Sequence, residues 1–512
     1  MPCKILSAAI TGLDAQIITV ENDISFGLRS FNIVGLGDKA VGEAKERVSA
    51  ALKNSKFSHP FKNALRVLIN LAPADLKKEG TLYDFPIALS FLLETKQTKF
   101  NPENKLFLGE LSLDGKLRPI KGVLPIALMA KEKKIEELIL PKENAAEAAI
   151  IKGIKVVGLE SLKEAIDYLE GRKKISSFKT DFSVFLKESV FSIDISWIKG
   201  QQTAKRALEV SAAGGHHLMM TGPPGTGKSL LAKAICSILP KLSFEEILEV
   251  TKIYSIAGLL SKEKPFVSFR PFRAPHHASS EAALIGGGNP PRPGEITLSH
   301  RGVLFLDEFP EFHRDVLESL RQPIEEGKIT ILRAKNAINF PCSFTLVAAS
   351  NPCPCGHLNS PEIPCTCTSS QISSYRRKLS GPLMDRIDIF IEVPQVKYEK
   401  LISPNSGQES KKIKERVQAA RTIQKQRFEK DKENFSCLLN SEMKIPQIEK
   451  YCQIDPKSQN LLRKYVDSGK LSARGYHRVL KVARTIADLA STEKISFSHL
   501  AEALMYRMKE ET

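Results

Sequence analysis

The stretch "TGPPGTGKS" at residues 221–229 contains glycines, a lysine and a serine in the order G-x-x-x-x-G-K-S. An apolar run, "HLMM" at 217–220, precedes it, and a helix-like segment, "LLAKAICSIL" at 230–239, follows it. A strand, a glycine-rich loop and a helix in this order form a phosphate-binding loop, because the loop amides and the helix N-terminus both face the anion. The sequence therefore predicts an α/β fold built around a nucleotide site.

Two further apolar runs end in polar residues that fit the same site. The run "GVLFLDE" at 302–308 reads as a buried strand that delivers Asp307 and Glu308 to its carboxyl end, where α/β sheets bind ligands. The run "SFTLVAASN" at 343–351 reads as another buried strand and ends in Asn351. That amide can orient a water molecule against the γ-phosphate, or it can simply cap the next turn.

Each of these residue types suits one step of ATP hydrolysis with Mg²⁺. Lys228 is expected to reach the β- and γ-phosphates, while Ser229 and Asp307 are expected to hold Mg²⁺. Glu308 is placed to accept a proton from the attacking water. The predicted nucleotide-binding residues are Gly222, Pro223, Pro224, Gly225, Thr226, Gly227, Lys228, Ser229, Leu230 and Asp307.

The overall composition favours a polyanionic partner. The chain has 512 residues, a formal net charge of +17 and a pI of about 9.3. This excess of basic residues suits nucleic acid or an anionic membrane surface, and we favour nucleic acid. The sequence has no secretory signal and no apolar run near the ~20 residues that span a bilayer, so we expect a cytoplasmic protein with no membrane partner.

The pattern of apolar residues divides the chain into four segments. Residues 1–170 alternate strand-like and helix-like runs, and the basic stretch 171–194 reads as a linker. Residues 195–396 contain the buried strands and glycine-rich turns, and 397–512 are mostly helical. Within these segments we expect strands at 65–74 and 155–159 and helices at 42–55, 143–151 and 413–428.

Together these motifs resemble the ComM/YifB family of magnesium-chelatase-like AAA+ ATPases, and the resemblance covers essentially the whole chain. It identifies 222–229 as Walker A, 303–308 as Walker B and Asn351 as sensor 1. The other supporting segments are "RPFRAPHHASSEAALIGGG" (270–288), "PRPGEITLSHRGVLFLDE" (291–308), "LRQPIEEGKITI" (320–331), "SNPCPCG" (350–356), "LSGPLMDRIDIFIEVP" (379–394) and "LSARGYHRVLKVARTIADL" (471–489). The fold that it implies is an AAA+ core with a helical lid.

The resemblance also implies a ring, which we expect to be a hexamer, with ATP sites between subunits. One subunit must then lend groups to the nucleotide of its neighbour. Arg386 matches the arginine finger of related AAA+ proteins, with Arg376 and Arg377 as rivals. Arg474 matches sensor 2 of the lid, and Arg478 is the alternative.

A segment between the two Walker motifs carries Arg273, His276, His277 and three glycines at 286–288. Adjacent histidines point to different faces of a helix or strand, so joint metal ligation is awkward. The resemblance instead suggests an insert that projects toward the ring pore, where a basic, glycine-rich loop can follow a nucleic-acid backbone.

Residues 1–170 resemble a Lon-protease-like domain of the ribosomal-protein-S5 domain 2 type, an α+β fold. Proteolysis of this type needs a serine nucleophile and a lysine base. Alignment of "KEGTLYDF" (78–85) and "RPIKGVLPI" (118–126) with the family pattern places Leu82 and Leu124 at those positions. We therefore expect no protease activity, although Ser90 and Lys121 lie nearby in the sequence.

Four functions fit this sequence to different degrees. The first is an ATP-driven motor on single-stranded or branched DNA, which in the ComM-like family is a branch-migration helicase that assists DNA integration during natural transformation. The second is a magnesium-chelatase ATPase subunit that remodels a protein partner. That class shares the ATPase core, but a Lon-like N-terminal domain is not part of its pattern. The missing dyad opposes the third, an ATP-dependent protease. The intact Walker residues oppose the fourth, a non-enzymatic scaffold.

Four of the nine cysteines fall in one loop directly after Asn351, as the pairs Cys353/Cys355 and Cys365/Cys367. Their number favours a structural zinc site, although C-x-C pairs replace the commoner C-x-x-C spacing. His357 could replace one thiolate. A redox disulfide and a loop with idle cysteines remain as alternatives.

Overall fold

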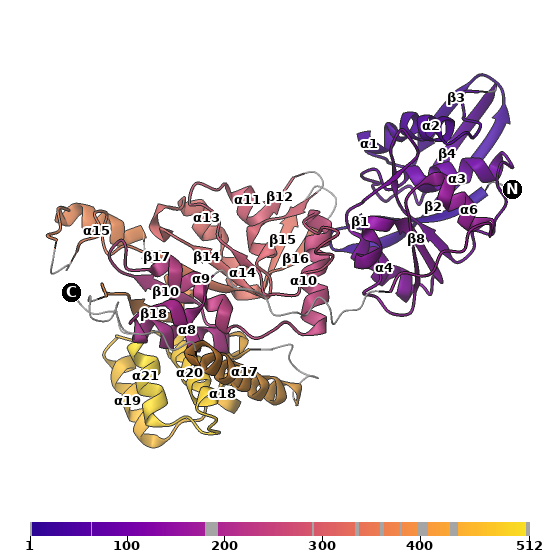
Figure 1. Cartoon of the computed structure of the whole chain (residues 1–512). Coiled ribbons are helices and arrows are strands. Elements are labelled where there is room, and N and C mark those ends of the chain that lie inside the picture. The colour runs from indigo at the N-terminus through magenta and orange to yellow at the C-terminus, as the bar shows by residue number, and fades with distance from the viewer. Residues whose placement is uncertain are drawn as a thin grey trace.

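The structure of the chain is a computed structural model. It describes residues 3–62, 64–179, 193–288, 291–332, 337–358, 363–378, 381, 383–396, 408–430 and 439–507. Most of the predicted linker at 171–194 and the boundary at 396/397 therefore lie outside the described residues, as do 359–362 within the cysteine loop. Figure 1 shows three parts: an N-terminal sheet with its helices, a central sheet with its helices, and a group of C-terminal helices.

The N-terminal part is built on a mixed seven-stranded sheet in the order β3-β4-β2-β1-β5-β8-β9. The pairs β1/β2 and β2/β4 are antiparallel, and the pairs β3/β4, β1/β5, β5/β8 and β8/β9 are parallel. The strands are β1 (Cys3–Thr11), β2 (Asp14–Phe26), β3 (Ser30–Val34), β4 (Leu65–Ala72), β5 (Lys105–Phe107), β8 (Glu137–Pro141) and β9 (Lys155–Leu159), with a small hairpin of β6 (Glu110–Leu111) and β7 (Leu117–Arg118).

Helices cover this sheet because their apolar faces pack with the buried side chains of its strands in one continuous core. They are α1 (Lys39–Gly42), α2 (Ala44–Asn54), α3 (Asp84–Glu94), α4 (Val123–Glu132), α5 (Ala145–Ala148) and α6 (Leu162–Leu169), with the 3₁₀ turn η1 (Lys142–Asn144). Helix α3 is buried along nearly its whole length, so this sequence of apolar residues forms the centre of the domain.

The central part contains a five-stranded, fully parallel sheet in the order β11-β14-β17-β10-β18. Its strands are β10 (Leu218–Thr221), β11 (Phe272–Arg273), β14 (Val303–Leu306), β17 (Thr345–Ser350) and β18 (Ile389–Glu392). Strands β10, β14 and β17 are almost entirely buried, as expected for parallel strands that helices cover on both faces. All carboxyl ends of these strands meet at one edge, so their terminal residues lie together.

The connections of the central sheet are helical, with two hairpins inserted. The helices are α8 (Gln202–Gly214), α9 (Lys228–Ile238), α10 (Phe244–Ala257), α11 (Glu281–Ile285), α12 (Glu295–Leu298), α13 (Arg314–Ser319), α14 (Arg321–Glu326) and α15 (Ser369–Lys378), with the 3₁₀ turns η2 (Ile195–Trp197), η3 (Phe309–Glu311) and η4 (Met384–Arg386). The hairpins are β12 (Gly286–Gly287) with β13 (Arg292–Pro293), and β15 (Lys328–Leu332) with β16 (Ala337–Pro341).

The C-terminal helices share a core with one face of the central sheet. They are α17 (Gln408–Glu429), α18 (Ile445–Tyr451), α19 (Pro456–Asp467), α20 (Ala473–Leu489) and α21 (Phe497–Met505), with the 3₁₀ turn η5 (Asn440–Glu442). Figure 1 shows them gathered beneath β10 and β18. The continuous core explains why this helical group stays attached to the sheet that carries the phosphate loop.

Helix α10 joins the central part to the N-terminal part. Ile247 of this helix packs within the N-terminal core. The Ser255 hydroxyl donates to Glu147 at 2.5 Å, and the Gly122 amide donates to the Ser255 carbonyl at 3.1 Å. Burial raises the pKa of Glu147 to about 7, with Ser255 opposing that shift. The two parts therefore meet through specific contacts as well as through the chain that connects them.

The sequence-based expectations for the elements mostly agree with the structure. The strands expected at 155–159, 302–308 and 343–351 and the helices at 42–55 and 413–428 are present with trimmed ends. The strand expected at 65–74 ends at Ala72, because Pro73 has no N–H for the ladder. The helix expected at 143–151 is shorter: η1 and α5 end at Ala148, before a turn with Gly153 at φ +100° leads into β9.

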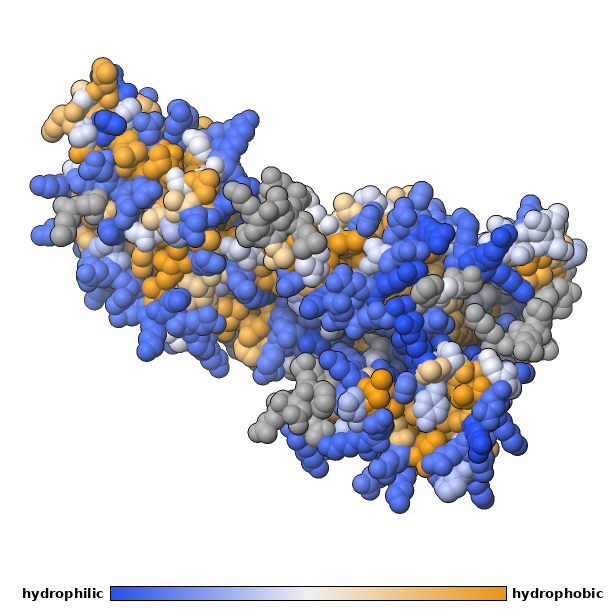
Figure 2. Space-filling view, turned by 180° about the vertical axis from the view of Figure 1, so that it is seen from behind, coloured by the Kyte–Doolittle hydropathy of each residue, from blue (hydrophilic) through white to orange (hydrophobic). Residues whose placement is uncertain are grey.

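The surface is mixed in character. In Figure 2 apolar residues gather in patches over the N-terminal part and the C-terminal helices, whereas the region between them is mainly hydrophilic. Among the described residues, no helix combines the length and the hydropathy that crossing a bilayer requires.

Candidate nucleotide site and four-cysteine loop

The phosphate loop connects β10 to α9, as its sequence predicts. Gly225 and Gly227 have φ of +77° and +87°, conformations that favour glycine. Gly222 meets a different constraint, because a Cβ there would lie 2.3 Å from the Val393 carbonyl oxygen. The Thr226 hydroxyl donates to the Pro223 carbonyl at 2.9 Å and closes the loop. The glycines are therefore required both by backbone conformation and by close packing.

Lys228 is held inside this loop. Its Nζ donates to the carbonyls of Gly222 and Pro223 at 2.6 and 2.8 Å and to Asn351 Oδ1 at 3.2 Å. Burial lowers the pKa of Lys228, and the carboxylate of Asp307 opposes that shift. The structure thus brings the lysine of the loop and the terminal amide of β17 into contact, as the parallel strand ends predict.

The residues expected to hold Mg²⁺ also meet. The Ser229 hydroxyl donates to Asp307 Oδ2 at 2.6 Å, and the Glu308 amide donates to Asp307 Oδ1 at 3.0 Å. A hydroxyl and a carboxylate at the N-terminus of α9 are oxygen ligands that suit Mg²⁺ beside phosphate. The donor set therefore fits this metal.

Glu308 stands in an unusual position at the end of β14. Its backbone has φ +50°, and 57% of its side chain is exposed. The Oε2 atom of Glu308 lies 3.1 Å from Nδ1 of His277, whose ring lies edge-on to Phe312 with ring centroids 6.5 Å apart. The sequence did not predict this contact. The residues between 277 and 308 show no periodicity that would bring His277 and Glu308 together.

The arginines expected to act between subunits occupy different environments. Arg386 in η4 is only 9% exposed along its side chain and forms an ion pair with Glu325 of α14 at 2.5 Å. Arg474 is exposed in the first turn of α20, whereas Arg478, one turn later, pairs with buried Asp388 at 2.5 Å. Arg376 and Arg377 lie in the last turn of α15.

Three other predicted features have clear positions. Arg273 forms an ion pair with Glu295 at 2.5 Å, and the glycines at 286–288 lie in and beside the β12–β13 hairpin. Leu230 in the first turn of α9 is 42% exposed. The rings of His276 and His277 lie in contact, with centroids 4.1 Å apart and planes tilted by 35°.

The positions assigned to a proteolytic dyad are apolar core. Leu82 is 7% exposed and Leu124 is fully buried, and both belong to the N-terminal core. Ser90 is also buried, and its hydroxyl donates to the Ile87 carbonyl within α3. The side chain of Lys121 instead packs against Gly258 at the end of α10. A Cβ placed on Gly258 would lie only 2.5 Å from Cε of Lys121.

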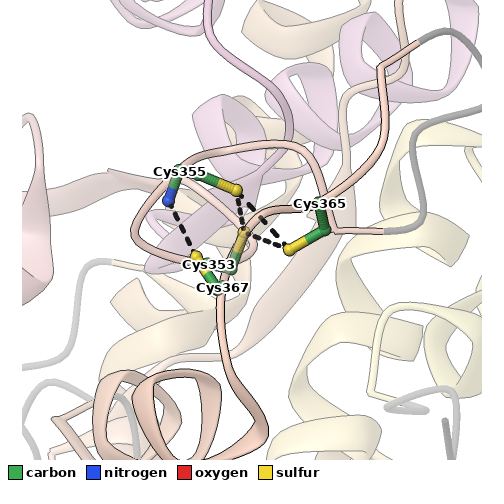
Figure 3. Close-up of side chains that lie close together, drawn as sticks. All are labelled: Cys353, Cys355, Cys365 and Cys367. Atoms are coloured by element: carbon green, nitrogen blue, oxygen red, sulfur yellow. Dashed lines mark hydrogen bonds between the residues drawn. The ribbon is translucent and has the colours of Figure 1, made fainter.

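The four cysteines of the loop converge at one point (Figure 3). Their Sγ atoms all lie within 4.8 Å of one another. Cys353 Sγ lies 3.4 Å from Cys355 Sγ and 3.7 Å from Cys365 Sγ, and the last two sulfurs are 3.5 Å apart. Cys367 Sγ accepts the Cys355 amide at 3.3 Å.

These spacings can be compared with those of a metal tetrathiolate. A tetrahedral site with Zn–S bonds of ~2.3 Å separates its sulfurs by about 3.8 Å. The three sulfur–sulfur distances among Cys353, Cys355 and Cys365 lie just below that value. His357 stays outside the described cluster of ligand atoms. The residues therefore fit a single tetrahedral metal ion with four sulfur ligands.

The parallel sheet, the phosphate loop and the paired Asp307 and Glu308 define a P-loop nucleotide site. Comparisons with known proteins extend this class. Three family models match the chain: "Magnesium chelatase, subunit ChlI" over residues 194–401, "Subunit ChlI of Mg-chelatase" over 20–144, and "Magnesium chelatase, subunit ChlI C-terminal" over 407–507.

Curated relatives match along almost the whole chain. The chain is 42% identical to competence protein ComM of Haemophilus influenzae, over 98% of this chain and 97% of that protein. It is 41% identical to the protein YifB of Escherichia coli, over 98% and 96%. A more distant similarity, 24% identity over 52% of this chain and 29% of the relative, links it to the DNA helicase MCM8 of Bos taurus. The chain belongs to the ComM/YifB family of magnesium-chelatase-like AAA+ ATPases.

One comparison corrects an argument made from the sequence. The expectation that a chelatase-type subunit lacks this N-terminal domain is wrong, because residues 20–144 match a family model described as a subunit of magnesium chelatase. The presence of this domain therefore does not separate the two functions.

Proposed function

We propose that this AAA+ ATPase is a ring motor that acts on DNA, as a branch-migration helicase that supports DNA integration in natural transformation and recombination. The observation that carries the proposal is the full-length similarity to competence protein ComM, combined with the assembled phosphate site. The net charge of +17 agrees with a polyanionic substrate. A motor that acts on DNA in this way is expected in the cytoplasm.

The proposed roles of the site residues follow from their contacts. Lys228, now bonded to loop carbonyls and Asn351, exchanges these partners for phosphate oxygens. Ser229 and Asp307 hold Mg²⁺, which when bound neutralises charge on the phosphates. Glu308 takes the proton of the attacking water, and Asn351 orients that water.

The proposed assembly is a homo-oligomeric ring, most simply a hexamer, in which neighbouring subunits complete each ATP site. Arg386 is the proposed finger, and it must leave Glu325 to reach a neighbour. Arg474 is the proposed sensor 2, because Arg478 is already engaged by Asp388. A guanidinium fork suits the charge spread over a transferring phosphoryl group.

The proposed domain division is a Lon-protease-like domain of the S5 domain 2 type at 1–170, a linker at 171–194, an AAA+ core at 195–396 and a helical lid at 397–512. The buried leucines at 82 and 124 support a protease-type fold that has lost its chemistry. The contacts of α10 with Glu147 and Gly122 support a role for this domain in positioning the core.

The decisive experiment measures ATP hydrolysis by the full chain with and without forked and three-stranded DNA. We expect DNA to stimulate hydrolysis, and we expect binding to weaken steeply as salt rises, because phosphate contacts release counterions. Lys228→Ala should abolish nucleotide binding, which ties the hydrolysis and its stimulation by DNA to this site. A protein that neither binds DNA nor responds to it at moderate salt would defeat the motor proposal.

A chelatase-type ATPase subunit that remodels a protein partner is the second candidate, favoured by the descriptions of the three matching family models. It predicts that hydrolysis responds to a protein partner and is indifferent to DNA. The same assay therefore decides between the two candidates.

We also infer that Cys353, Cys355, Cys365 and Cys367 bind one Zn²⁺ ion. Four thiolates that converge within 4.8 Å would fill every position of a tetrahedral zinc ion and leave none open for substrate, so the proposed site is structural. Elemental analysis of the purified chain should give one zinc per chain. A protein without metal and with normal activity would favour idle cysteines, and reversible pairing of the thiols would favour the redox alternative.

A further inference from the structure

The four-cysteine loop lies against the phosphate loop. Gly356, one residue after Cys355, has φ +82°, and a Cβ placed on it would lie 2.6 Å from Cδ of Pro224. The Gly356 amide donates to the Cys353 carbonyl at 3.0 Å, so this glycine belongs to the tight turn between the first two cysteines. The turn that brings two sulfurs together is therefore the same turn that touches the loop expected to hold ATP.

The ends of the cysteine loop are fixed by two other parts of the site. Cys353 is fully buried and follows Asn351, which contacts Lys228, by two residues. Cys367 precedes helix α15 (Ser369–Lys378) by two residues. Tyr375 of that helix is 6% exposed, and burial raises its pKa to about 12, a shift that the backbone of Asn351 opposes. The cysteine loop thus spans from the end of β17, past Pro224, back to a helix that packs beside Asn351.

The sequence of this loop gives it little other means of holding its shape. Its fifteen residues, 353–367, contain three prolines and no regular element among those described. Bringing four thiolates within 4.8 Å of one another is costly without a cation, because like charges repel. A metal ion removes that repulsion and joins the two C-x-C pairs across twelve residues.

We propose that the metal of this cluster braces the phosphate loop, so that nucleotide affinity depends on zinc occupancy of a site that never touches the nucleotide. Zinc holds the turn Cys353–Gly356, and the turn holds Pro224 in place. Loss of zinc frees the turn, lets Pro224 shift and misaligns the amides of Gly225 to Gly227. This proposal rests on the proposed nucleotide site and is independent of whether the motor acts on DNA.

The experiment measures metal content and nucleotide affinity in the same full-length preparations. Zinc and iron are determined by elemental analysis, because iron also occupies four-sulfur tetrahedral sites. Binding of a fluorescent ADP analogue is then titrated for the wild type, Cys365→Ser and Cys3→Ser. Cys365 lies in the far C-x-C pair, and Cys3 is a matched control in the N-terminal sheet.

We expect one zinc per chain in the wild type and in Cys3→Ser, with equal affinities. Cys365→Ser should lose zinc and bind the nucleotide about tenfold more weakly, while thermal unfolding shows a folded chain. Gly356→Ala provides a second route, because it keeps all four thiols but adds a Cβ against Pro224 at a φ that disfavours alanine. It should keep zinc and still weaken nucleotide binding.

Three results would overturn the brace. They are a wild type with iron or no metal, a zinc-free Cys365→Ser with wild-type affinity, and a Gly356→Ala that binds nucleotide normally. Lys228→Ala separates this failure from failure of the nucleotide site itself. If Lys228→Ala bound the analogue as tightly as the wild type, the site assignment would be wrong whatever the zinc content.

Discussion

Nδ1 of His277 lies 3.1 Å from Oε2 of Glu308. The two residues are separated by 31 positions, and the segment between them contains helix α11 and the β12–β13 hairpin. In this contact His277 occupies one carboxylate oxygen of Glu308, so that oxygen is not free to accept a proton from the attacking water. The hairpin that is proposed to follow nucleic acid is therefore connected, through a short stretch of chain, to the proposed base.

His277→Ala should raise ATP hydrolysis in the absence of DNA by roughly threefold to tenfold, because it releases Glu308 to act as a base. The ratio of the DNA-stimulated rate to the basal rate should fall. If DNA stimulates hydrolysis partly by releasing Glu308 from His277, the variant already lacks the contact that DNA would break. Steady-state rates with saturating ATP measure both quantities.

His276→Ala is the matched control, because the ring of His276 lies against that of His277 at 4.1 Å, whereas the contact with Glu308 is made by His277. It should leave the basal rate near that of the wild type. An equal fall of basal and stimulated rates in His277→Ala would show that His277 supports Glu308 instead of restraining it.

Glu308→Gln should keep nucleotide binding and slow hydrolysis by at least about 100-fold, because an amide cannot accept the proton of the attacking water. The variant retains the backbone contact with Asp307, so the proposed metal ligands are undisturbed. Nucleotide titration together with single-turnover hydrolysis measures the two properties separately. A Glu308→Gln protein that turns over normally would remove this residue from the base role.

The arrangement of the candidate nucleotide site could be predicted from sequence because its pattern is local or follows from parallel strands. The loop 221–229 carries its own pattern, and Asp307 and Asn351 each end a buried apolar run. Parallel strands bring such ends to one edge, so the contact between Asn351 and Lys228 follows from the fold class. The four cysteines converge for a similar reason, since their pairs lie within one short loop.

The contacts that were not predicted join segments whose relative position only the folded chain defines. Glu325 and Arg386 lie in separate helical turns, and no spacing relates them. His277 and Glu308 meet across an insert, and Gly356 meets Pro224 across a loop. The seven-stranded order of the N-terminal sheet is equally invisible to periodicity, because β5 pairs with β1 after about a hundred residues of other structure.

Arg386 gives a prediction about the ring. If it acts on the nucleotide of a neighbour, Arg386→Ala and Glu308→Gln should each be nearly inactive alone and should complement each other when mixed. At equal proportions, about a quarter of random interfaces combine an intact base with an intact finger. ATPase activity of the mixture should therefore recover to roughly that fraction of the wild-type value.

The control mixes Glu308→Gln with a Glu308→Gln chain that also carries Arg386→Ala, a pair with no intact base, and it should remain inactive. Arg376→Ala and Arg377→Ala test the rival positions in α15 in the same way. Complementation by either of these, without complementation by Arg386→Ala, would move the finger to α15. In that event the ion pair of Arg386 with Glu325 would be purely structural.

His217 predicts how the stability of the central domain depends on pH. Its Nδ1 accepts the backbone N–H of Leu346 at 3.0 Å, which requires an unprotonated nitrogen. Burial lowers the pKa of His217 to about 4 from 6.5, while Asp388 opposes and Arg478 reinforces that shift. Between pH 4 and 6.5, therefore, His217 is protonated in the unfolded chain but neutral in the folded chain.

The sign of the effect follows from that difference in protonation. The contribution of His217 is fully present above pH 6.5 and is lost as pH falls toward 4. Its upper limit is on the order of 3 kcal/mol. Denaturant unfolding at pH 7.5, 6 and 5, followed by fluorescence of the single tryptophan Trp197 in the central domain, measures this contribution.

His217→Asn is the control, because Oδ1 of the asparagine can accept the same N–H without titrating. The variant should lose less stability than the wild type over this range, and identical slopes would show that other groups, such as buried His300, govern the acid sensitivity.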